Sequence, residues 1–177
     1  MQLFWSQGYE ATGVADLLET MEIGRQSMYD TFGDKRSLFL EALRAYFSEQ
    51  GTRVVGQLRA PGSPLANLKA VFAQWEQMLA EIGPFGCLMG NTAAELGPHD
   101  EEAAQIVRGG FVRVSRELAE TIRLGQEAGE IRAGDPDELA SLIVATIQGA
   151  ALLTKVEPGM ETGHAAFRKQ FLDPGHI

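Results

Sequence analysis

A short segment at residues 24–38, GRQSMYDTFGDKRSL, gathers hydrogen-bonding side chains ahead of a Phe-Gly break and a lysine. Three of them, Arg25, Gln26 and Ser27, stand at the beginning of an expected short helix. Arginine can donate two hydrogen bonds to guanine, glutamine can pair with adenine, and serine can reach a base or a phosphate. These residues suit base recognition in DNA, although the same pattern is also that of an ordinary solvated helix face above core residues.

The elements around this segment have the spacing of a helix-turn-helix. Upstream, Thr12 can cap a short helix, GVADLLETM, whose apolar residues face inward. Residues 22–24 form the turn, and Gly24 is expected to be the N-cap of the second helix. In such a motif the second helix lies in the major groove, where its first residues meet the base edges.

The rest of the chain is predicted to be a series of helices. Apolar residues at helical spacing predict them at about 35–57, 65–82, 86–96, 100–128, 135–155 and 162–172. In the helix at 135–155, Asp135 can cap and Pro136 can open the first turn. Its run ASLIVATIQGAALLT is apolar nearly all round, which predicts burial on more than one face. No segment has a convincing strand period, so we predict an all-α protein.

Composition and the lack of other motifs exclude several classes of function. The chain has 177 residues, 45% of them hydrophobic, one cysteine, and a net charge of −9 from 15 Lys+Arg against 24 Asp+Glu. Such a chain should repel polyanions, so DNA binding must depend on local placement of charge. Without a secretory signal or a run of eighteen apolar residues, we expect a cytoplasmic protein with no membrane partner. Without catalytic motifs or histidines at metal-site spacing, we expect no enzyme, no metal and no cofactor.

The segment LFWSQGYEATGVADLLETMEIGRQSMYDTFGDKRSLFLEAL resembles the DNA-binding segment of the TetR family of transcriptional repressors. The likeness lies in its F..GY.AT.V entry, its Y..F..K..L exit and the lengths between them. It implies a helix-turn-helix three-helix domain at 1–46 and a helical ligand-binding and dimerisation domain at 47–177. It further implies a homodimer that binds a palindromic operator in double-stranded DNA and releases it when a small-molecule effector binds. Operator, effector and regulated gene stay open at this point.

The resemblance also assigns DNA contacts by position. The seven matching residues are Thr12, Arg25, Gln26, Ser27, Tyr29, Thr31 and Lys35. The lysine matches one that holds a phosphate at the start of the fourth helix, where backbone N–H groups favour the same anion. The first helix is shorter than the family's usual one, and residues 1–46 carry four Lys+Arg against seven Asp+Glu. We therefore expect weak DNA binding, and a native start upstream of Met1 would account for both features.

The effector site is expected in the C-terminal part, with an apolar or aromatic ligand. The candidate pocket residues are Phe72, Trp75, Met78, Met89, Asn91 and Phe111, together with Met160. Ordinary core packing is the alternative for each apolar one. Asn91 and Gln148 are polar inside otherwise apolar helices, and each is expected to find a partner inside the protein, with water or a ligand as the alternative. Cys87 is expected to act as a small hydrophobe, with a sensor thiol as the alternative.

Dimerisation is expected through the helices at 135–155 and 162–172, so that Arg or Glu at Ala150 should give monomers. The leading interpretation is a repressor released from its operator by an effector. The alternative is a protein that keeps this fold and binds small molecules or partners, with weak or lost DNA binding.

Overall fold

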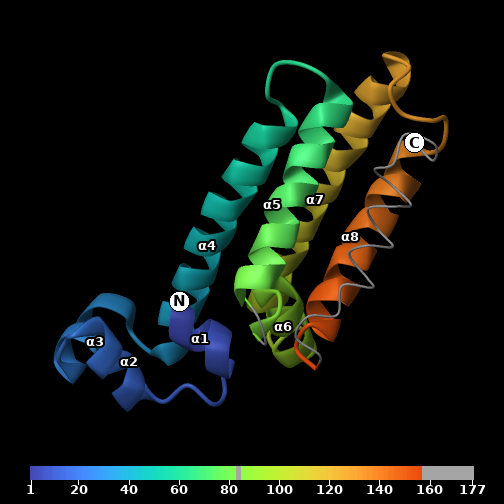
Figure 1. Ribbon diagram of the computed structural model, residues 1–177. Helices are drawn as coiled ribbons and strands as arrows, with labels where there is room; N and C mark the ends of the chain where they lie inside the picture. The colour runs from blue at the N-terminus through green and yellow to red at the C-terminus, as the bar shows by residue number, and fades with distance from the viewer. Residues whose placement is uncertain (83–84, 157–177) are drawn as a thin grey trace. The chain divides into compact units, whose positions relative to one another are not determined.

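The computed structural model describes residues 1–82 and 85–156, and in them helices alternate with turns and short loops (Figure 1). The helices are α1 (Gln2–Gln7), α2 (Val14–Met21), α3 (Arg25–Phe32), α4 (Lys35–Leu58), α5 (Pro64–Ile82), α6 (Leu88–Glu95), α7 (Glu101–Glu127) and α8 (Pro136–Leu153). No strand occurs in these residues, and the predicted all-α class is confirmed. The helix expected at 162–172, and Met160, lie outside the described residues.

Two compact units divide the chain. The first combines Met1–Gln50 with Leu88–Arg108, and the second combines Gly51–Cys87 with the chain from Gly109 onward. Residues 88–108 join the first unit partly through Glu95, whose carboxylate accepts hydrogen bonds from the backbone N–H groups of Tyr9 (3.0 Å) and Glu10 (2.8 Å). The units therefore do not coincide with the ranges 1–46 and 47–177 expected from the sequence.

The core of the first unit holds the short helices in place. Each of its first four helices contributes buried residues, among them Phe4, Leu17, Met28 and Phe39. The rings of Phe4 and Phe39 meet edge-on with centroids 5.0 Å apart. Met28 is completely buried and fixes the inner side of α3. The opposite side of this two-turn helix is therefore turned to solvent.

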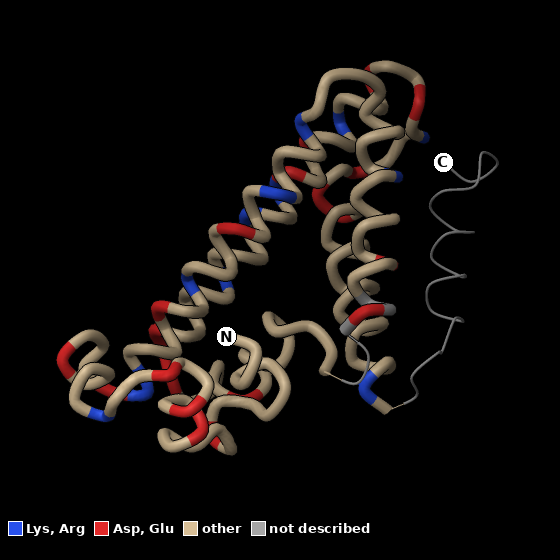
Figure 2. The backbone as a smooth tube through the Cα atoms, turned by 60° about the vertical axis from the view of Figure 1, so that its left-hand side comes forward, with Lys and Arg blue, Asp and Glu red and all other residues tan. Residues whose placement is uncertain are grey.

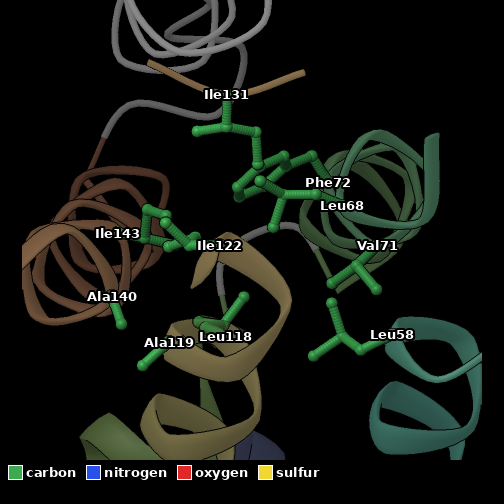
Figure 3. Close-up of a cluster of buried hydrophobic side chains, with 10 residues drawn as sticks. All are labelled: Leu58, Leu68, Val71, Phe72, Leu118, Ala119, Ile122, Ile131, Ala140 and Ile143. Atoms are coloured by element: carbon green, nitrogen blue, oxygen red, sulfur yellow. The ribbon is translucent and has the colours of Figure 1, made fainter. Parts of the chain in front are cut away.

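The core of the second unit lies between α5, α7 and α8, with the end of α4 added (Figure 3). Its buried residues are Leu58, Leu68, Val71, Phe72, Leu118, Ala119, Ile122, Ile131, Ala140 and Ile143. Ile131 follows α7 and folds back onto it at Gly125, where an added Cβ would lie 2.5 Å from the Ile131 Cδ1 atom. A glycine at this position allows the loop to approach α7 closely.

Helix α8 begins as predicted. The Asp135 side chain accepts hydrogen bonds from the N–H groups of Asp137 (2.8 Å) and Glu138 (3.2 Å), and Pro136 opens the first turn. By length and composition α8 is also apolar enough to span a membrane, with a mean hydropathy of 1.2. Core helices of soluble proteins pass the same test, so this is weak grounds for a membrane segment.

Within the single chain α8 is buried mainly along one stripe, and its burial on more than one face stays a prediction for the assembly with a second chain. Only 22% of the helix is buried, along the stripe that includes Ala140, Ile143 and Ala151. Leu142 and Leu152 are 49% and 63% exposed. The described residues of one chain therefore cover mainly one side of this helix.

A buried carboxylate in the second unit gives a first testable prediction. Glu117 on α7 is almost fully buried and accepts two hydrogen bonds from Arg59, at 2.7 and 2.8 Å, and one from Arg116 at 3.2 Å. The hydrogen bonds from Arg59 lower the pKa of Glu117 below 4.5 against the opposing effect of burial. A carboxyl group with a lowered pKa in the folded state stabilises the fold above its unfolded-state pKa, and the contribution disappears as the pH falls through the folded value.

We therefore expect Arg59→Ala to lower the midpoint temperature of thermal unfolding at neutral pH. The decrease should become smaller as the pH falls below about 4.5, the pKa of Glu117 in the unfolded chain. Thermal unfolding followed by circular dichroism between pH 3 and 7 measures this difference. Arg132→Ala, at an exposed position, is the control and should leave the midpoint unchanged at every pH. A decrease for Arg59→Ala that is independent of pH would contradict the assignment.

Candidate nucleic-acid interface

Helices α2 and α3 form a helix-turn-helix whose turn is set by the backbone. After Met21, Glu22 takes up the left-handed conformation, with φ 53° and ψ 38°. The N–H of Ile23 then donates to the Leu18 carbonyl (3.2 Å), closing the end of α2. Gly24, with φ −73° and ψ 155°, is the N-cap of α3. The predicted turn at 22–24 and the predicted N-cap are confirmed.

The predicted role of Thr12 as a helix cap is wrong. The N-cap of α2 is Gly13, and no side chain hydrogen-bonds to the free N–H groups there. Thr12 is fully buried, and its hydroxyl donates to the Gly8 carbonyl at 2.6 Å. This bond closes the loop between α1 and α2. The DNA contact assigned to Thr12 stays a prediction, and its side chain has no exposed atoms with which to make one.

The outer side of α3 presents the residues expected to meet DNA. The exposed set is Arg25, Gln26, Ser27, Tyr29, Asp30 and Thr31. Tyr29 is 40% exposed, which is unusual for a large aromatic side chain. The structure thus brings five of the seven predicted DNA-contacting residues onto one short helix. Their contacts with DNA themselves stay predictions.

Lys35, the first residue of α4, is half-buried against the loop between α1 and α2. Its Nζ atom donates to the Glu10 carbonyl (3.3 Å) and lies 4.5 Å from the centroid of the Tyr9 ring. Burial, reinforced by the negative charges of Glu10 and Asp34, raises the pKa of the Tyr9 phenol. The phenol is therefore a neutral hydrogen-bond donor at physiological pH, next to the lysine.

The next two cations of α4 are engaged within the unit. Arg36 makes two hydrogen bonds to Asp100, at 2.7 and 2.8 Å, and a third to Glu102 at 3.0 Å. Arg44 also pairs with Glu102. The hydrogen bonds from Arg36 lower the pKa of Asp100 to about 2. Both arginines are thus directed at the beginning of α7, and their charges are compensated there.

The first unit is strongly acidic as a whole. It contains five Lys+Arg against twelve Asp+Glu, whose positions are coloured in Figure 2. Two of the five cations pair with the start of α7, and Arg108 lies 3.9 Å from Glu101. Among residues 1–82 and 85–156, Arg25 has no ion pair, and Lys35 has only a carbonyl and a ring as neighbours. Phosphate attraction must therefore come mainly from Arg25, Lys35 and backbone N–H groups.

The six predicted ligand-binding residues fall in both units. Met89 and Asn91 lie on α6 in the first unit, and Phe72, Trp75, Met78 and Phe111 lie in the second. Phe72 is only 2% exposed and belongs to the core, so the alternative of ordinary packing holds for it. Trp75 is half-buried, and its ring lies edge-on to Phe72 at 5.7 Å. Ligand contacts of all six stay predictions.

The predictions for Gln148 and Cys87, which both lie in the second unit, have different outcomes. The Gln148 Oε1 atom is buried and accepts no hydrogen bond among the described residues, so the expected partner inside the protein is not found for this atom there. It lies on α8 between Val144, which packs on the main core, and Ala151, which packs with Cys87. Cys87 is half-buried there, in keeping with a small apolar role. A buried acceptor with no partner among the described residues still needs a donor.

Sequence reasoning missed several acidic residues that hold the N-terminal helices in place. Glu95, Asp100 and Glu102 bind the loop after α1 and the arginines of α4. It also missed Asp30, which accepts a hydrogen bond from Gln26 at 2.7 Å. That pair could have been found, because residues four apart on a helix are neighbours.

Comparison with known proteins agrees with this geometry. Residues 1–42 match the family described as "Bacterial regulatory proteins, tetR family", and residues 64–169 match "Tetracyclin repressor-like, C-terminal domain". The uncharacterised regulator YezE of Bacillus subtilis is 34% identical over 142 residues, 77% of this chain and 71% of that protein. The repressor DhaR of Mycobacterium sp. (strain GP1) is 30% identical over 166 residues, 90% of this chain and 80% of that protein.

Solved structures show the same arrangement of the fold. The regulatory protein TetR from Rhodobacter sphaeroides has a TM-score of 0.83 at 28% identity, over 98% of this chain and 92% of that one. CifR, solved with a 26-base-pair double-stranded operator, has a TM-score of 0.80 at 27% identity, over 94% of this chain and 88% of that one. Together with the two family matches and the helix-turn-helix of α2 and α3, these likenesses show that the chain belongs to the TetR family of bacterial transcriptional regulators.

Proposed function

We propose that this regulator is a cytoplasmic repressor that binds a palindromic operator as a homodimer, with α3 in the major groove, and leaves it when a small apolar or aromatic effector binds. The observation that carries the proposal is the exposed polar side of α3, held in place by the buried Met28. CifR, a protein of similar structure, has been solved bound to operator DNA, which supports the same role for this chain.

Selection from random duplexes tests the DNA-binding part directly. A regulator that reads bases should enrich a sequence with two half-sites whose centres are about one helical turn, roughly 34 Å, apart. Because few cations are free in the first unit, its non-specific affinity should be low even at low salt. Enrichment of no sequence, at any salt concentration, would refute base recognition.

We place the effector in the second unit, beside Trp75 and Gln148. Trp75 is half-buried next to the core, so that a bound apolar ligand would change its surroundings. The buried Oε1 atom of Gln148 would accept a hydrogen bond from one polar group of the ligand. The effector can release DNA only by the free energy with which it prefers the conformation that does not bind.

Trp75 also provides the measurement for this part of the proposal. Trp5 contributes background fluorescence and packs on Tyr46 at 5.4 Å, so the test uses Trp5→Phe. In that variant we expect apolar or aromatic compounds to quench Trp75 emission and to weaken operator binding about 5- to 150-fold over the same concentration range. Compounds that saturate the quenching while operator affinity stays constant would show that the ligand site and DNA binding are not coupled.

Two variants serve as controls for the effector site. Cys87→Ser should leave both responses intact, because Cys87 is expected to act through packing. Gln148→Leu should weaken only those compounds that carry a hydrogen-bond donor. Loss of both responses in Cys87→Ser would favour a thiol sensor instead.

A second candidate function is favoured by the charge of the first unit. With five cations against twelve acidic residues, this unit could have lost a useful affinity for DNA. The chain would then be a small-molecule-binding protein that keeps the family's fold. Quenching of Trp75 by ligands, combined with no enriched duplex, is the result that this second function predicts.

A further inference from the structure

Gln26 and Asp30 form a hydrogen-bonded pair on the exposed side of α3. They lie four residues apart, and the Gln26 Nε2 atom donates to the Asp30 Oδ1 atom at 2.7 Å. A carboxylate accepts hydrogen bonds and cannot donate them, so the part of the amide that faces it must be the nitrogen. The orientation of the Gln26 side chain is therefore fixed by chemistry as well as by the helix.

The pair leaves more acceptors than donors pointing to solvent. Asp30 keeps its Oδ2 atom, and Gln26 keeps its Oε1 atom and one N–H group. Among residues 1–82 and 85–156, neither side chain has a second polar partner. The combined surface of the two side chains is thus suited to a group that donates hydrogen bonds.

Hydrogen-bond donors are scarce in the major groove. Adenine and cytosine present exocyclic amino groups there, whereas guanine presents O6 and N7 and thymine presents O4, all of them acceptors. A carboxylate facing an acceptor would lose its hydration without a hydrogen bond in return, which discriminates against that base. Asp30 is also a negative charge close to phosphates, and this repulsion is offset only where the carboxylate meets a donor.

Resting on the proposed binding of DNA through α3, we infer that Asp30 reads the N4 amino group of a cytosine in each operator half-site, with Gln26 as the residue that positions it. Arg25, at the start of the same helix, donates hydrogen bonds and suits guanine. Helix α3 would then combine Arg25, which donates to the acceptor atoms of guanine, with the Gln26–Asp30 pair, which accepts from the amino group of cytosine.

The test uses the duplex obtained by random selection and single base-pair changes within it. For the wild-type protein, changing the cytosine to thymine removes the amino group and should lower affinity about 5- to 150-fold. 5-Methylcytosine has the methyl group of thymine but keeps the amino group, so it should be bound nearly as well as cytosine. Asp30→Asn should reduce the cytosine-to-thymine affinity ratio at this position about tenfold, because an asparagine can also donate to the O4 atom.

Two further variants distinguish recognition of the base by Asp30 from a general effect of its charge and from the positioning role of Gln26. Glu41→Gln removes the same charge from an exposed position on α4, so it should strengthen binding to all duplexes alike and leave the ratio unchanged. Gln26→Ala should lower the ratio by a smaller factor than Asp30→Asn, because it releases Asp30 but keeps the carboxylate. Since all three positions are exposed, the variants should fold.

The possible failures can be told apart. If a duplex is enriched and Arg25→Ala changes its base preference, but Asp30→Asn leaves the ratio unchanged at every position, this inference is overturned while the proposed function stands. If Asp30→Asn and Glu41→Gln have the same effect on all duplexes, Asp30 acts only as a charge and the inference is again overturned. If no duplex is enriched, the proposed function fails, and the inference with it.

Discussion

Glutamate at both Leu142 and Leu152 is expected to convert the regulator from a dimer into a monomer and to lower its operator affinity about 100-fold or more. Both side chains are exposed on α8, and they belong to a stripe with Ala145 and Gly149 at alternating steps of three and four residues. Such a stripe packs against a second helix, and two buried carboxylates would prevent this packing. Sedimentation equilibrium and titration of the selected duplex measure the two effects.

The choice of positions depends on the structure. Ala150, expected from the sequence to lie in the interface, is buried with Ala151 against Cys87 within one chain. A charge at Ala150 would therefore disturb packing within one chain, so this variant does not separate loss of the dimer from loss of stability. At Gly149 no described atom outside the backbone of α8 lies within 4 Å of an added Cβ, so Gly149→Arg is a second variant with the same expected result.

Val112→Glu is the matched control for dimerisation. Val112 lies on α7 and is 60% exposed, so the substitution adds one glutamate at an exposed apolar position that is not on α8. We expect it to keep the dimer and the operator affinity. A wild-type protein that is monomeric at micromolar concentration would refute the proposed interface.

Arg25→Ala is expected to relax base preference at one position of each half-site and to lower affinity for the selected duplex by about 1 to 3 kcal/mol. Arg25 is exposed at the start of α3 and has no ion pair among the described residues, so its guanidinium is available for a guanine. Affinities for a set of duplexes with single base-pair changes measure the loss of preference.

Lys35→Ala is the comparison variant for Arg25→Ala. It should weaken all duplexes alike and lower the slope of log affinity against log salt by about one unit, as expected for the loss of one phosphate contact. The Lys35 Nζ atom donates to the Glu10 carbonyl within the protein, so the thermal stability of the variant should be measured as well as its DNA affinity. If both variants shift every duplex equally, α3 is not the element that reads bases.

Local sequence was sufficient to predict the helices and the motif. Apolar spacing located the helices between residues 14 and 153, and N-cap residues marked where two of them begin, Gly24 for α3 and Asp135 for α8. These features depend on contacts between residues at most four apart, so a short window contains all the information. The resemblance of the first 45 residues or so to the TetR family rested on the same local signals.

The partners of polar side chains could be known only from the folded chain. Thr12 could cap a helix by its position, yet it is buried and bonded to Gly8 within the loop between α1 and α2. Arg36 pairs with Asp100, which lies 64 residues further along the chain. Whether Gln148 is satisfied or α8 is covered likewise depends on which neighbours the fold provides. Hydrogen bonds and burial between distant residues follow from packing in three dimensions, and no local pattern of the sequence contains them.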